Sequence, residues 1–332
     1  MVAHVIDGRR YASEVHDALA REVAELVAQG ARPGLGTIVV GEDYSAYAYE
    51  RRVRRLAHEL DMHYVRETLP SDVAEADAIA AVGKLGADPR ISGILVLRPL
   101  PPHVSEAALY RALDPLKDIE AVHPVNAGLL ALGRPRFVPS TPASVFHLLD
   151  RYLGEAGHEP GKFYRRSNIV IVGRSANVGK PAIALGMDRG ATILSCDVRS
   201  YTAGLLYRHT READILIVAT GVPGLISADH VKDGVIAVDV GINPVPDSET
   251  GKIHLVGDLD FQGVAERAEA ISPVPGGVGP ITDVWLLGNA IAAARLAHAT
   301  ESTRRVIEGG IEHDGVNGRL LTLDTEQAVG PR

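Results

Sequence analysis

The residues best suited to chemistry in this sequence form a loop bounded by glycines, Gly173–Pro181, which reads GRSANVGKP. The apolar run Ile169–Val172 directly before it predicts a buried strand, and a helix is predicted to begin at Gly179. Glycine lets a backbone approach phosphate groups closely, and free N–H groups at a helix start face an anion. The loop therefore predicts the pyrophosphate site of a dinucleotide. Its glycines are six residues apart and depart from the G-x-G-x-x-G pattern, so an ordinary strand–turn–helix junction stays an alternative for the loop alone.

Three other segments rich in glycine or proline strengthen this prediction. Thr220–Gly224 follows a predicted buried strand, and Asp239–Asn243 follows the next one. In a parallel sheet the carboxyl ends of the strands share one edge, where such folds bind their ligands. Pro273–Pro280 reads PVPGGVGP, so prolines stiffen it while glycines keep its middle permissive. Because it precedes a predicted long helix, we expect this loop to line the ligand cleft.

Alternating strands and helices must position these loops, and this alternation predicts βαβ units around a parallel sheet. Strands are predicted at residues 35–40, 64–65, 91–97, 168–172, 192–195, 215–219 and 235–240. Helices are predicted at residues 11–29, 45–60, 74–85, 141–152, 179–189, 201–210, 228–232 and 285–299. Ser45 is the expected N-cap of the second helix.

The 332 residues suggest two α/β domains. We expect an N-terminal substrate and catalytic domain at 1–150, joined by a C-terminal helix at 284–312. A Rossmann-like dinucleotide-binding domain with a parallel sheet is expected at 151–283, and a tail at 313–332. The polar stretch 154–166 is interpreted as the connection between the domains.

Composition narrows the function classes. The formal net charge is −8 and no long basic run occurs, so nucleic acid is not an expected partner. Arg51–Arg55 is a local basic run, open to interpretation as a solvated helix face or an anion site. No apolar run reaches the length of a membrane span, and the N-terminus lacks a signal-peptide stretch, which favours a cytoplasmic protein. The single cysteine, Cys196, excludes an intramolecular disulfide, and no metal ligands are assigned.

Together these segments resemble the methylenetetrahydrofolate dehydrogenase/cyclohydrolase family over about residues 6–297. The most specific similarity is Pro273–Thr282, followed by Gly173–Pro181. Weaker matches are Val40-Gly41 with Tyr49, Pro99–Pro101, Lys117-Asp118, His123–Asn126 and Thr141-Pro142. The resemblance implies a homodimer that oxidises methylenetetrahydrofolate with a dinucleotide, usually NADP. In many members it also implies hydrolysis of the methenyl product.

This chain departs from the family in one group of polar residues. The family has a Tyr-x-x-x-Lys pair, whose spacing places both side chains on one helix face. Tyr49 stands at the tyrosine position, but Val53 stands at the lysine position, and valine can neither move a proton nor orient water. Leu97 replaces a glutamine, and Glu120 and Ala121 replace an aspartate and a glycine. The chain is therefore expected to be a divergent member that lacks the usual catalytic lysine.

We expect NADP-dependent oxidation of methylenetetrahydrofolate, or of a close reduced-pterin relative, with the cyclohydrolase activity lost. Hydride transfer needs mainly two rings held face to face, whereas hydrolysis needs an activated water and a managed proton. One alternative is a bifunctional enzyme in which Arg52, brought in by a one-residue slip of the helix, or Glu120 compensates. Arginine stays protonated and could supply only charge. Another alternative is a non-catalytic dinucleotide-binding paralogue.

The resemblance also implies the individual site residues. Catalytic candidates are Tyr49 and Glu120. Substrate-binding candidates are Tyr49, Arg98, Pro99, Pro275, Gly276 and Gly277. Cofactor-binding candidates are Gly173, Arg174, Ser175, Val178, Gly179, Asp197, Arg199, Thr220, Gly221, Ile242 and Thr282. Tyr49 is a surface for stacking a pterin ring or a half-buried helix tyrosine. Arg174 and Arg199 favour NADP, whereas Asp197 favours NAD unless it only caps a loop, so NADP is expected with NAD possible.

Overall fold

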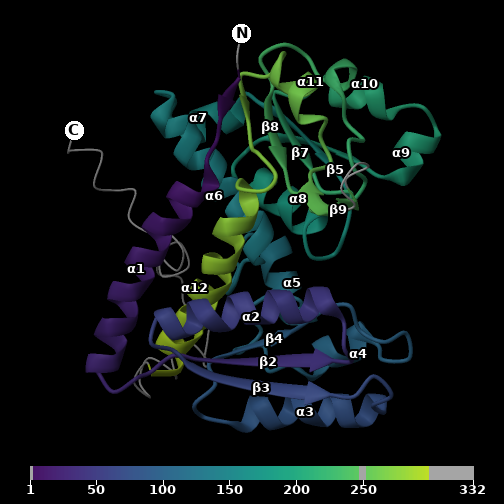
Figure 1. Cartoon of the computed structure of the whole chain (residues 1–332). Helices are drawn as coiled ribbons and strands as arrows, with labels where there is room; N and C mark the ends of the chain where they lie inside the picture. Colours follow the sequence, from purple (N-terminus) through teal and green to yellow (C-terminus); the bar gives the residue numbers. More distant parts are fainter. Residues whose placement is uncertain (1–2, 247–251, 299–332) are drawn as a thin grey trace. The chain divides into compact units, whose positions relative to one another are not determined.

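The computed structural model describes residues 3–246 and 252–298, which divide into two compact units (Figure 1). The β2 unit comprises residues 15–138 together with the chain from Leu286 onward. The β5 unit comprises the N-terminal residues up to Glu14 and residues 139–285. Two helices, α1 (Gly8–Ala28) and α12 (Val278–His298), contribute residues to both units.

The β2 unit is built on a three-stranded parallel sheet in the order β3-β2-β4. Its elements are β2 (Gly34–Val40), α2 (Tyr44–Glu59), β3 (His63–Leu69), α3 (Glu75–Ala87), β4 (Gly93–Val96), α4 (Glu106–Ala112) and α5 (Pro124–Ala131). Helices α2 and α3 lie on opposite faces of the sheet (Figure 1). Apolar residues of α3 and α4, such as Val82 and Leu109, pack on Ile38 and Val96 to form the core on the α3 face. Burial of this apolar surface stabilises the sheet, and α2 follows directly from its central strand, β2.

The start of α2 corrects one prediction. The N-cap is Asp43, whose carboxylate accepts a hydrogen bond from the Ala46 amide at 2.9 Å. Ser45, the expected cap, instead donates its hydroxyl to Asp43 Oδ1 at 2.5 Å. Asp and Ser are both good N-cap residues, and the extended backbone at Asp43 decides between them.

The β5 unit contains a six-stranded, all-parallel sheet in the order β1-β11-β8-β7-β5-β6. Its strands are β1 (His4–Val5), β5 (Asn168–Val172), β6 (Thr192–Cys196), β7 (Ile215–Val218), β8 (Ile236–Asp239) and β11 (Ala270–Ile271). Its helices are α6 (Ser140–Glu155), α7 (Pro160–Arg165), α8 (Gly179–Asp188), α9 (Val198–Thr202), α10 (Leu206–Thr210), η1 (Ala228–His230) and α11 (Phe261–Ala265). The chain leaves β5 toward β6 on one side and returns to β7 on the other. The carboxyl ends of β5 and β7 therefore form a topological switch point, where open α/β sheets bind ligands.

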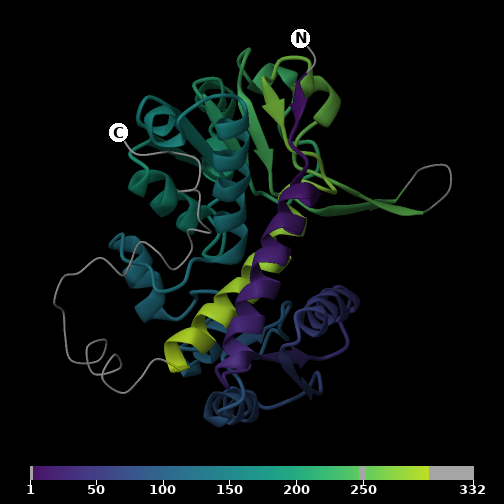
Figure 2. The ribbon, with the colours of Figure 1, turned by 90° about the vertical axis from the view of Figure 1, so that its left-hand side faces the viewer.

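A two-stranded antiparallel hairpin, β9 (Asn243–Pro246) and β10 (Ile253–Val256), also belongs to the β5 unit. Figure 2 shows it extending away from the parallel sheet. The sequence did not predict this hairpin, and it did not predict β1, β11, α4 or α5. None of the helices in the described part of the chain is long and apolar enough to cross a membrane.

Other element boundaries differ from the predictions. The stretch 154–166 contains α7 and lies inside the β5 unit, because buried Tyr164 donates to Asp150 on α6 at 2.6 Å. The division between the units accordingly falls at Pro139 and not near residue 150. The predicted helix 201–210 is two short helices, since Gly204 interrupts it with a φ of +69°. Helix α12 begins at Val278, earlier than predicted. The predicted extension to residue 312 and the tail lie outside the described residues.

Candidate functional site

The two glycines of the 173–181 loop are required by close backbone approaches in the β5 unit. Gly173 ends β5 with a φ of +119°, and a Cβ there would lie 2.2 Å from the carbonyl oxygen of Ala219 after β7. A Cβ on Gly179 would lie 2.0 Å from the carbonyl oxygen of Gly173. The first glycine therefore lets the two strands of the switch point meet, and the second lets α8 begin against the turn. This geometry explains their spacing of six.

The same loop presents backbone donors. The Ser175 hydroxyl accepts from the amides of Val178 and Gly179, and the Ser175 carbonyl accepts from Lys180. Within the described ranges, no hydrogen bond uses the amides of residues 174–177. Donors of this kind before a ten-residue helix suit a phosphate group. The loop thus fits the pyrophosphate of a dinucleotide.

Arg174 and Asp197 interact directly at the end of β6. The Arg174 guanidinium donates to the Ser195 hydroxyl at 2.8 Å, to the Ser195 carbonyl at 2.5 Å and to Asp197 Oδ2 at 2.9 Å. Asp197 Oδ1 accepts from the amides of Arg199 and Ser200, so Asp197 is also the N-cap of α9. Asp197 thus has a capping role, and Arg174 offsets the charge of the carboxylate. This weakens the objection that Asp197 would repel a 2′-phosphate.

Two carboxylates, Asp239 and Asp258, organise the neighbouring strand ends. The sequence indicated no role for either side chain. Asp258 Oδ2 accepts from the amide and hydroxyl of Thr220, at 2.5 and 2.9 Å, and from the Gly221 amide at 3.0 Å. Asp239 Oδ1 accepts from the amides of Gly241 and Asp258. Asp258 follows a hairpin that the sequence did not reveal, so no pattern marked it as part of the site. The Thr220–Gly221 turn is thus held by the buried carboxylate of Asp258, whose own amide donates to Asp239.

The Pro273–Pro280 loop is supported by the N-terminal segment, which the sequence did not indicate either. The Gly8 amide donates to the Gly276 carbonyl at 2.9 Å, and a Cβ on Gly8 would lie 1.8 Å from the carbonyl oxygen of Gly277. Gly276 has a φ of +119°. The Arg9 guanidinium donates to the Pro275 carbonyl at 3.4 Å. Chain segments more than 260 residues apart therefore define the backbone of this loop.

The remaining cofactor candidates lie near the start of α12. The Thr282 hydroxyl donates to the Val278 carbonyl at 3.2 Å within the first turn of that helix. The exposed side chain of Ile242 reaches to within 3.9 Å of a Cβ placed on Gly279. Ile242 and the helix start therefore share one neighbourhood.

In the β2 unit, helix α2 carries the Tyr49, Arg52 and Val53 positions of the Tyr-x-x-x-Lys comparison. Val53 is fully buried, whereas Arg52 is exposed and its guanidinium lies 5.2 Å from the centroid of the Tyr49 ring. This distance is typical of a cation–π contact. Arg52 therefore does not occupy the buried position that Val53 has, and Leu97 is buried like Val53. Neither position supplies a polar group.

Glu120 and Arg98 form an ion pair in this unit. Arg98 Nη2 lies 3.4 Å from Glu120 Oε1, and the Glu120 side chain is 16% exposed. Burial raises the pKa of Glu120 to about 7, Arg98 opposes this rise, and Asp118 and Glu106 add to it. A carboxyl group with a pKa near neutrality can both accept and donate a proton under physiological conditions.

Tyr110 of α4 was not a sequence candidate, yet it belongs to the same cluster. Its hydroxyl is buried and has no hydrogen-bond partner within residues 3–246 and 252–298. Burial raises the pKa of Tyr110, and the Arg98 and Glu120 charges act on it. An unsatisfied buried hydroxyl costs free energy unless a ligand or water pairs with it. Tyr110 therefore marks a polar position beside the Arg98–Glu120 pair.

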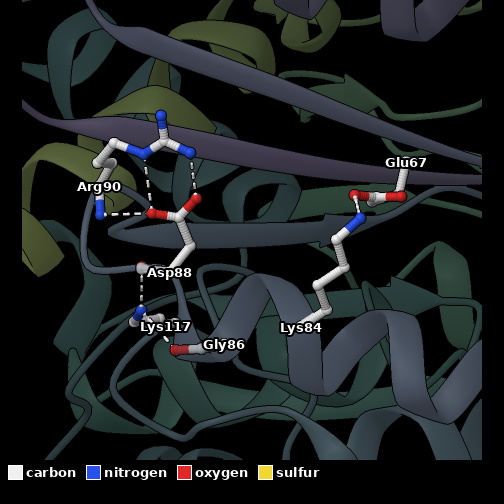
Figure 3. A network of polar contacts seen from close by, with 6 residues as sticks. All are labelled: Glu67, Lys84, Gly86, Asp88, Arg90 and Lys117. Atoms are coloured by element: carbon white, nitrogen blue, oxygen red, sulfur yellow. Dashed lines mark hydrogen bonds and ion pairs between the residues drawn. The ribbon is translucent and has the colours of Figure 1, made fainter.

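Lys117 does not replace the missing lysine. Its ammonium group donates to the carbonyls of Gly86 and Asp88, at 2.7 and 2.9 Å, and thereby ties its own loop to the C-terminal end of α3 (Figure 3). The adjacent Asp118 is fully buried and accepts from the amides of Val122 and His123 and from Asn126 Nδ2. These two residues hold the chain on either side of Glu120 rather than handle a proton.

Comparison with known proteins gives matches along nearly the whole described chain. The family model for the tetrahydrofolate dehydrogenase/cyclohydrolase catalytic domain matches residues 6–120, and the model for its NAD(P)-binding domain matches residues 139–298. The bifunctional protein FolD 3 of Rubrobacter xylanophilus is 62% identical over 95% of this chain and 100% of its own length. The bifunctional protein FolD of Bacillus subtilis is 38% identical over 89% of this chain and 99% of its own.

Solved structures agree with these matches. The bifunctional FolD of Campylobacter jejuni has a TM-score of 0.80 and 33% identity, covering 88% of this chain and 99% of that one. The Trypanosoma brucei enzyme, complexed with NADP and an inhibitor, has a TM-score of 0.83 and 32% identity, covering 90% and 100%. The predicted two-domain α/β fold with a Rossmann-like unit is confirmed. The expected loss of cyclohydrolase activity is not supported, because these relatives are named as bifunctional.

Proposed function

Because the chain belongs to the tetrahydrofolate dehydrogenase/cyclohydrolase family, we propose that it oxidises 5,10-methylenetetrahydrofolate with NADP and hydrolyses the methenyl product. The observation that carries the hydrolytic half of this proposal is the largely buried Glu120 carboxyl, which lies 3.4 Å from the Arg98 guanidinium. Its pKa of about 7 suits proton transfer in a chain without the family lysine. This replaces our expectation of a dehydrogenase alone with the alternative in which Glu120 compensates.

The residues of the β5 unit would hold the dinucleotide, which supplies the hydride acceptor. The proposed contacts are Gly173, Arg174, Ser175, Val178, Gly179, Asp197, Arg199, Thr220, Gly221, Ile242 and Thr282. NADP is favoured over NAD because Arg174 offsets the charge of Asp197, and because the Trypanosoma brucei relative is complexed with NADP. The pyrophosphate would meet the amides of the 173–181 loop.

The proposed folate contacts in the β2 unit are Tyr49, Arg98 and Pro99. Pro275, Gly276 and Gly277 of the β5 unit stay candidates from the sequence. The Tyr49 ring offers a stacking surface for the pterin, and the Arg52 guanidinium already lies over this ring. Arg98 supplies a permanent positive charge beside Glu120. A tyrosine hydroxyl is a poor general base near neutral pH, so we assign proton transfer to Glu120 and not to Tyr49.

In the hydrolytic step, water adds to the methenyl carbon and gives one proton to the Glu120 carboxylate. The bond from that carbon to one ring nitrogen then breaks, and Glu120 returns a proton to the departing nitrogen. The second water proton leaves to solvent, so the carboxyl ends in its starting state. Arg98 stabilises the ionised form of Glu120, which is present before the first transfer and again after the second.

Two assays on the purified full chain test the proposal. Methylenetetrahydrofolate should reduce NADP, and to a lesser extent NAD, and methenyltetrahydrofolate should decay faster than in buffer. No turnover with either dinucleotide would contradict the dehydrogenase activity. A methenyl decay equal to the buffer rate would restore the interpretation as a dehydrogenase alone, and calorimetric binding of dinucleotide without any turnover would indicate a non-catalytic paralogue.

Two further expectations remain predictions. The resemblance implies a homodimer, which light scattering on the full chain would test. The cytoplasmic location expected from the sequence would be tested by fractionation of the cells that produce the protein.

A further inference from the structure

Two buried carboxylates, Asp239 and Asp258, connect the strand-end segments of the β5 unit. Asp258 accepts three hydrogen bonds from the Thr220–Gly221 turn through one oxygen, and one from Asn243 Nδ2 at 2.8 Å through the other. Asp239 accepts from the amides of Gly241, Asp258 and Leu259, at 2.9, 3.0 and 2.8 Å. The Asp239 amide in turn donates to the Ser272 hydroxyl, directly before the Pro273 loop. One network therefore fixes several loops at once.

The two acids are interlocked with two glycines. A Cβ on Gly241, two residues after Asp239, would lie 2.0 Å from Asp258 Oδ1. A Cβ on Gly257, directly before Asp258, would lie 1.9 Å from Asp239 Oδ2. Each carboxylate thus occupies the space that a side chain on the other segment would need. Glycine at both positions is required by the acids and not by turn geometry, since neither has a positive φ.

The pair is held by hydrogen-bond donors rather than by a cation. Among the residues that the structure describes, no lysine, arginine or histidine forms an ion pair with either acid, and the partners are amides and one hydroxyl. Burial raises the pKa of Asp239 to about 6, while three backbone hydrogen bonds oppose the rise, so Asp239 is ionised at neutral pH. The chain segments at Thr220 and Gly241, which follow β7 and β8, are therefore in direct contact with these buried carboxylates.

This negative charge determines which part of a dinucleotide each loop of the β5 unit can bind. The Thr220 and Gly221 amides already donate to Asp258, so they are not available to a phosphate, which the acids would also repel. The pyrophosphate is better served by the 173–181 loop. The oxidised nicotinamide ring carries a positive charge, which a buried carboxylate pair attracts.

We propose that Asp258, held in place by Asp239, is a positioning residue that shapes the Thr220–Gly221 turn for the nicotinamide end of the dinucleotide and favours its oxidised form. This inference rests on the proposed function, because it presumes that the β5 unit binds a dinucleotide. It adds a discrimination between the oxidised and the reduced cofactor.

The test is dinucleotide binding to the full chain in the absence of folate, measured by calorimetry for NADP and by NADPH fluorescence. Asp258→Asn keeps the side-chain shape and removes one charge, so the Kd for NADP should rise about tenfold and the Kd for NADPH about threefold. Thr220→Val removes one hydrogen bond but no charge and should weaken both forms equally. Asp260→Asn is the matched control, because Asp260 is an exposed N-cap of α11 and should change neither Kd.

The possible outcomes test the positioning role, the assignment to the nicotinamide end and the proposed function separately. Unchanged binding in Asp258→Asn overturns the positioning role, and an equal loss for both forms overturns the assignment to the nicotinamide end. If Asp258→Asn does not fold, Asp239→Asn removes a charge of the same pair and should raise the ratio of the two Kd values. A wild-type chain that binds neither form refutes the proposed function itself, whereas normal wild-type binding with unaltered variants refutes only this inference.

Discussion

The dinucleotide loops of the β5 unit and the Tyr49–Glu120 cluster of the β2 unit are built in different ways. In the β5 unit, the decisive contacts run through backbone atoms, as where Gly173 meets the carbonyl of Ala219. In the β2 unit, the decisive groups are side chains, and Val53 and Leu97 occupy two positions where the resemblance implies a lysine and a glutamine. Ala121 adopts a φ of +53°, a conformation that favours glycine, at the position where the resemblance implies a glycine.

This difference teaches where function can change without loss of fold. A site made by close backbone approach depends on a few glycines and tolerates other side-chain changes. A site made by side chains can lose or gain chemistry through single substitutions on an unchanged helix or strand end. The β2 unit illustrates the second case, because a carboxyl at residue 120 acquires a near-neutral pKa from its surroundings.

The largest expected effect would come from Gly173→Ala. The added Cβ would lie 2.2 Å from the Ala219 carbonyl oxygen, at a φ of +119° that L side chains rarely adopt. We expect dinucleotide affinity to fall by at least about a hundredfold and the free energy of unfolding to fall by about 3 kcal/mol. Calorimetry and urea unfolding would measure the two effects.

Gly204→Ala is the control for this substitution. Gly204 has a φ of +69°, but no atom lies within 4 Å of the position that its Cβ would occupy, so only the conformational cost of about 1 kcal/mol applies. If both variants lost the same stability and bound dinucleotide alike, the close approach at the switch point would not matter and the contrast between the units would collapse.

Glu120→Gln tests the side-chain site. The amide keeps the size of the carboxyl but cannot take a proton from water, so methenyltetrahydrofolate hydrolysis should slow about a hundredfold. Dehydrogenase turnover should change less than the hydrolysis does. In the wild-type chain, the hydrolysis rate should follow an ionisation near pH 7 that the variant lacks.

Glu106→Gln is the matched control, because Glu106 is an exposed carboxyl on α4 whose charge acts on Glu120. It should leave the rate at optimal pH nearly unchanged. Equal hydrolysis by the Glu120→Gln variant and the wild type would show that another group moves the proton.

The pH dependence of stability offers a third test of Glu120. Its pKa rises from 4.5 to about 7 on folding, so both states hold the proton below pH 4.5. As the pH rises from there to about 7, the unfolded chain loses its proton first and the folded state loses stability. Glu120→Gln removes this loss, so its stability relative to wild type should increase by about 3 kcal/mol across the window. Parallel stability curves from denaturant unfolding would contradict the shifted pKa.

Much of the fold could be predicted because continuous apolar runs and helical periodicity are local signals. The runs that became β2, β5, β7 and β8 are buried on both faces, and this is what a parallel sheet requires. The two-residue strands β1 and β11 escaped prediction because a pair of residues carries no periodicity. The helix around Tyr164 was not predicted, because the segment is mostly polar and only this one ring is buried.

In the candidate site, too, some residues could be predicted from the sequence and others could not. Gly173 and Gly179 were predictable because close backbone approach demands glycine whatever the neighbours are. The role of Asp258 was not, since its partners Thr220 and Gly221 lie 38 and 37 residues away in sequence. The properties of Glu120 were not either, because they depend on burial and on Arg98, which only the folded chain brings near.

The smallest expected effect concerns the choice between NADP and NAD. Arg174→Met removes the cation that pairs with Asp197, so a 2′-phosphate would lose an attraction and meet an uncompensated carboxylate. A single exposed ion pair contributes little, so the preference for NADP over NAD should fall only about five- to tenfold, with NAD binding nearly unchanged. Arg211→Met removes the same charge beside Tyr207 and should leave the preference unaltered. If the Arg174 variant kept the wild-type ratio of Kd values in calorimetry, Arg199 would be the remaining candidate, and cofactor choice would rest on α9 rather than on the glycine loop.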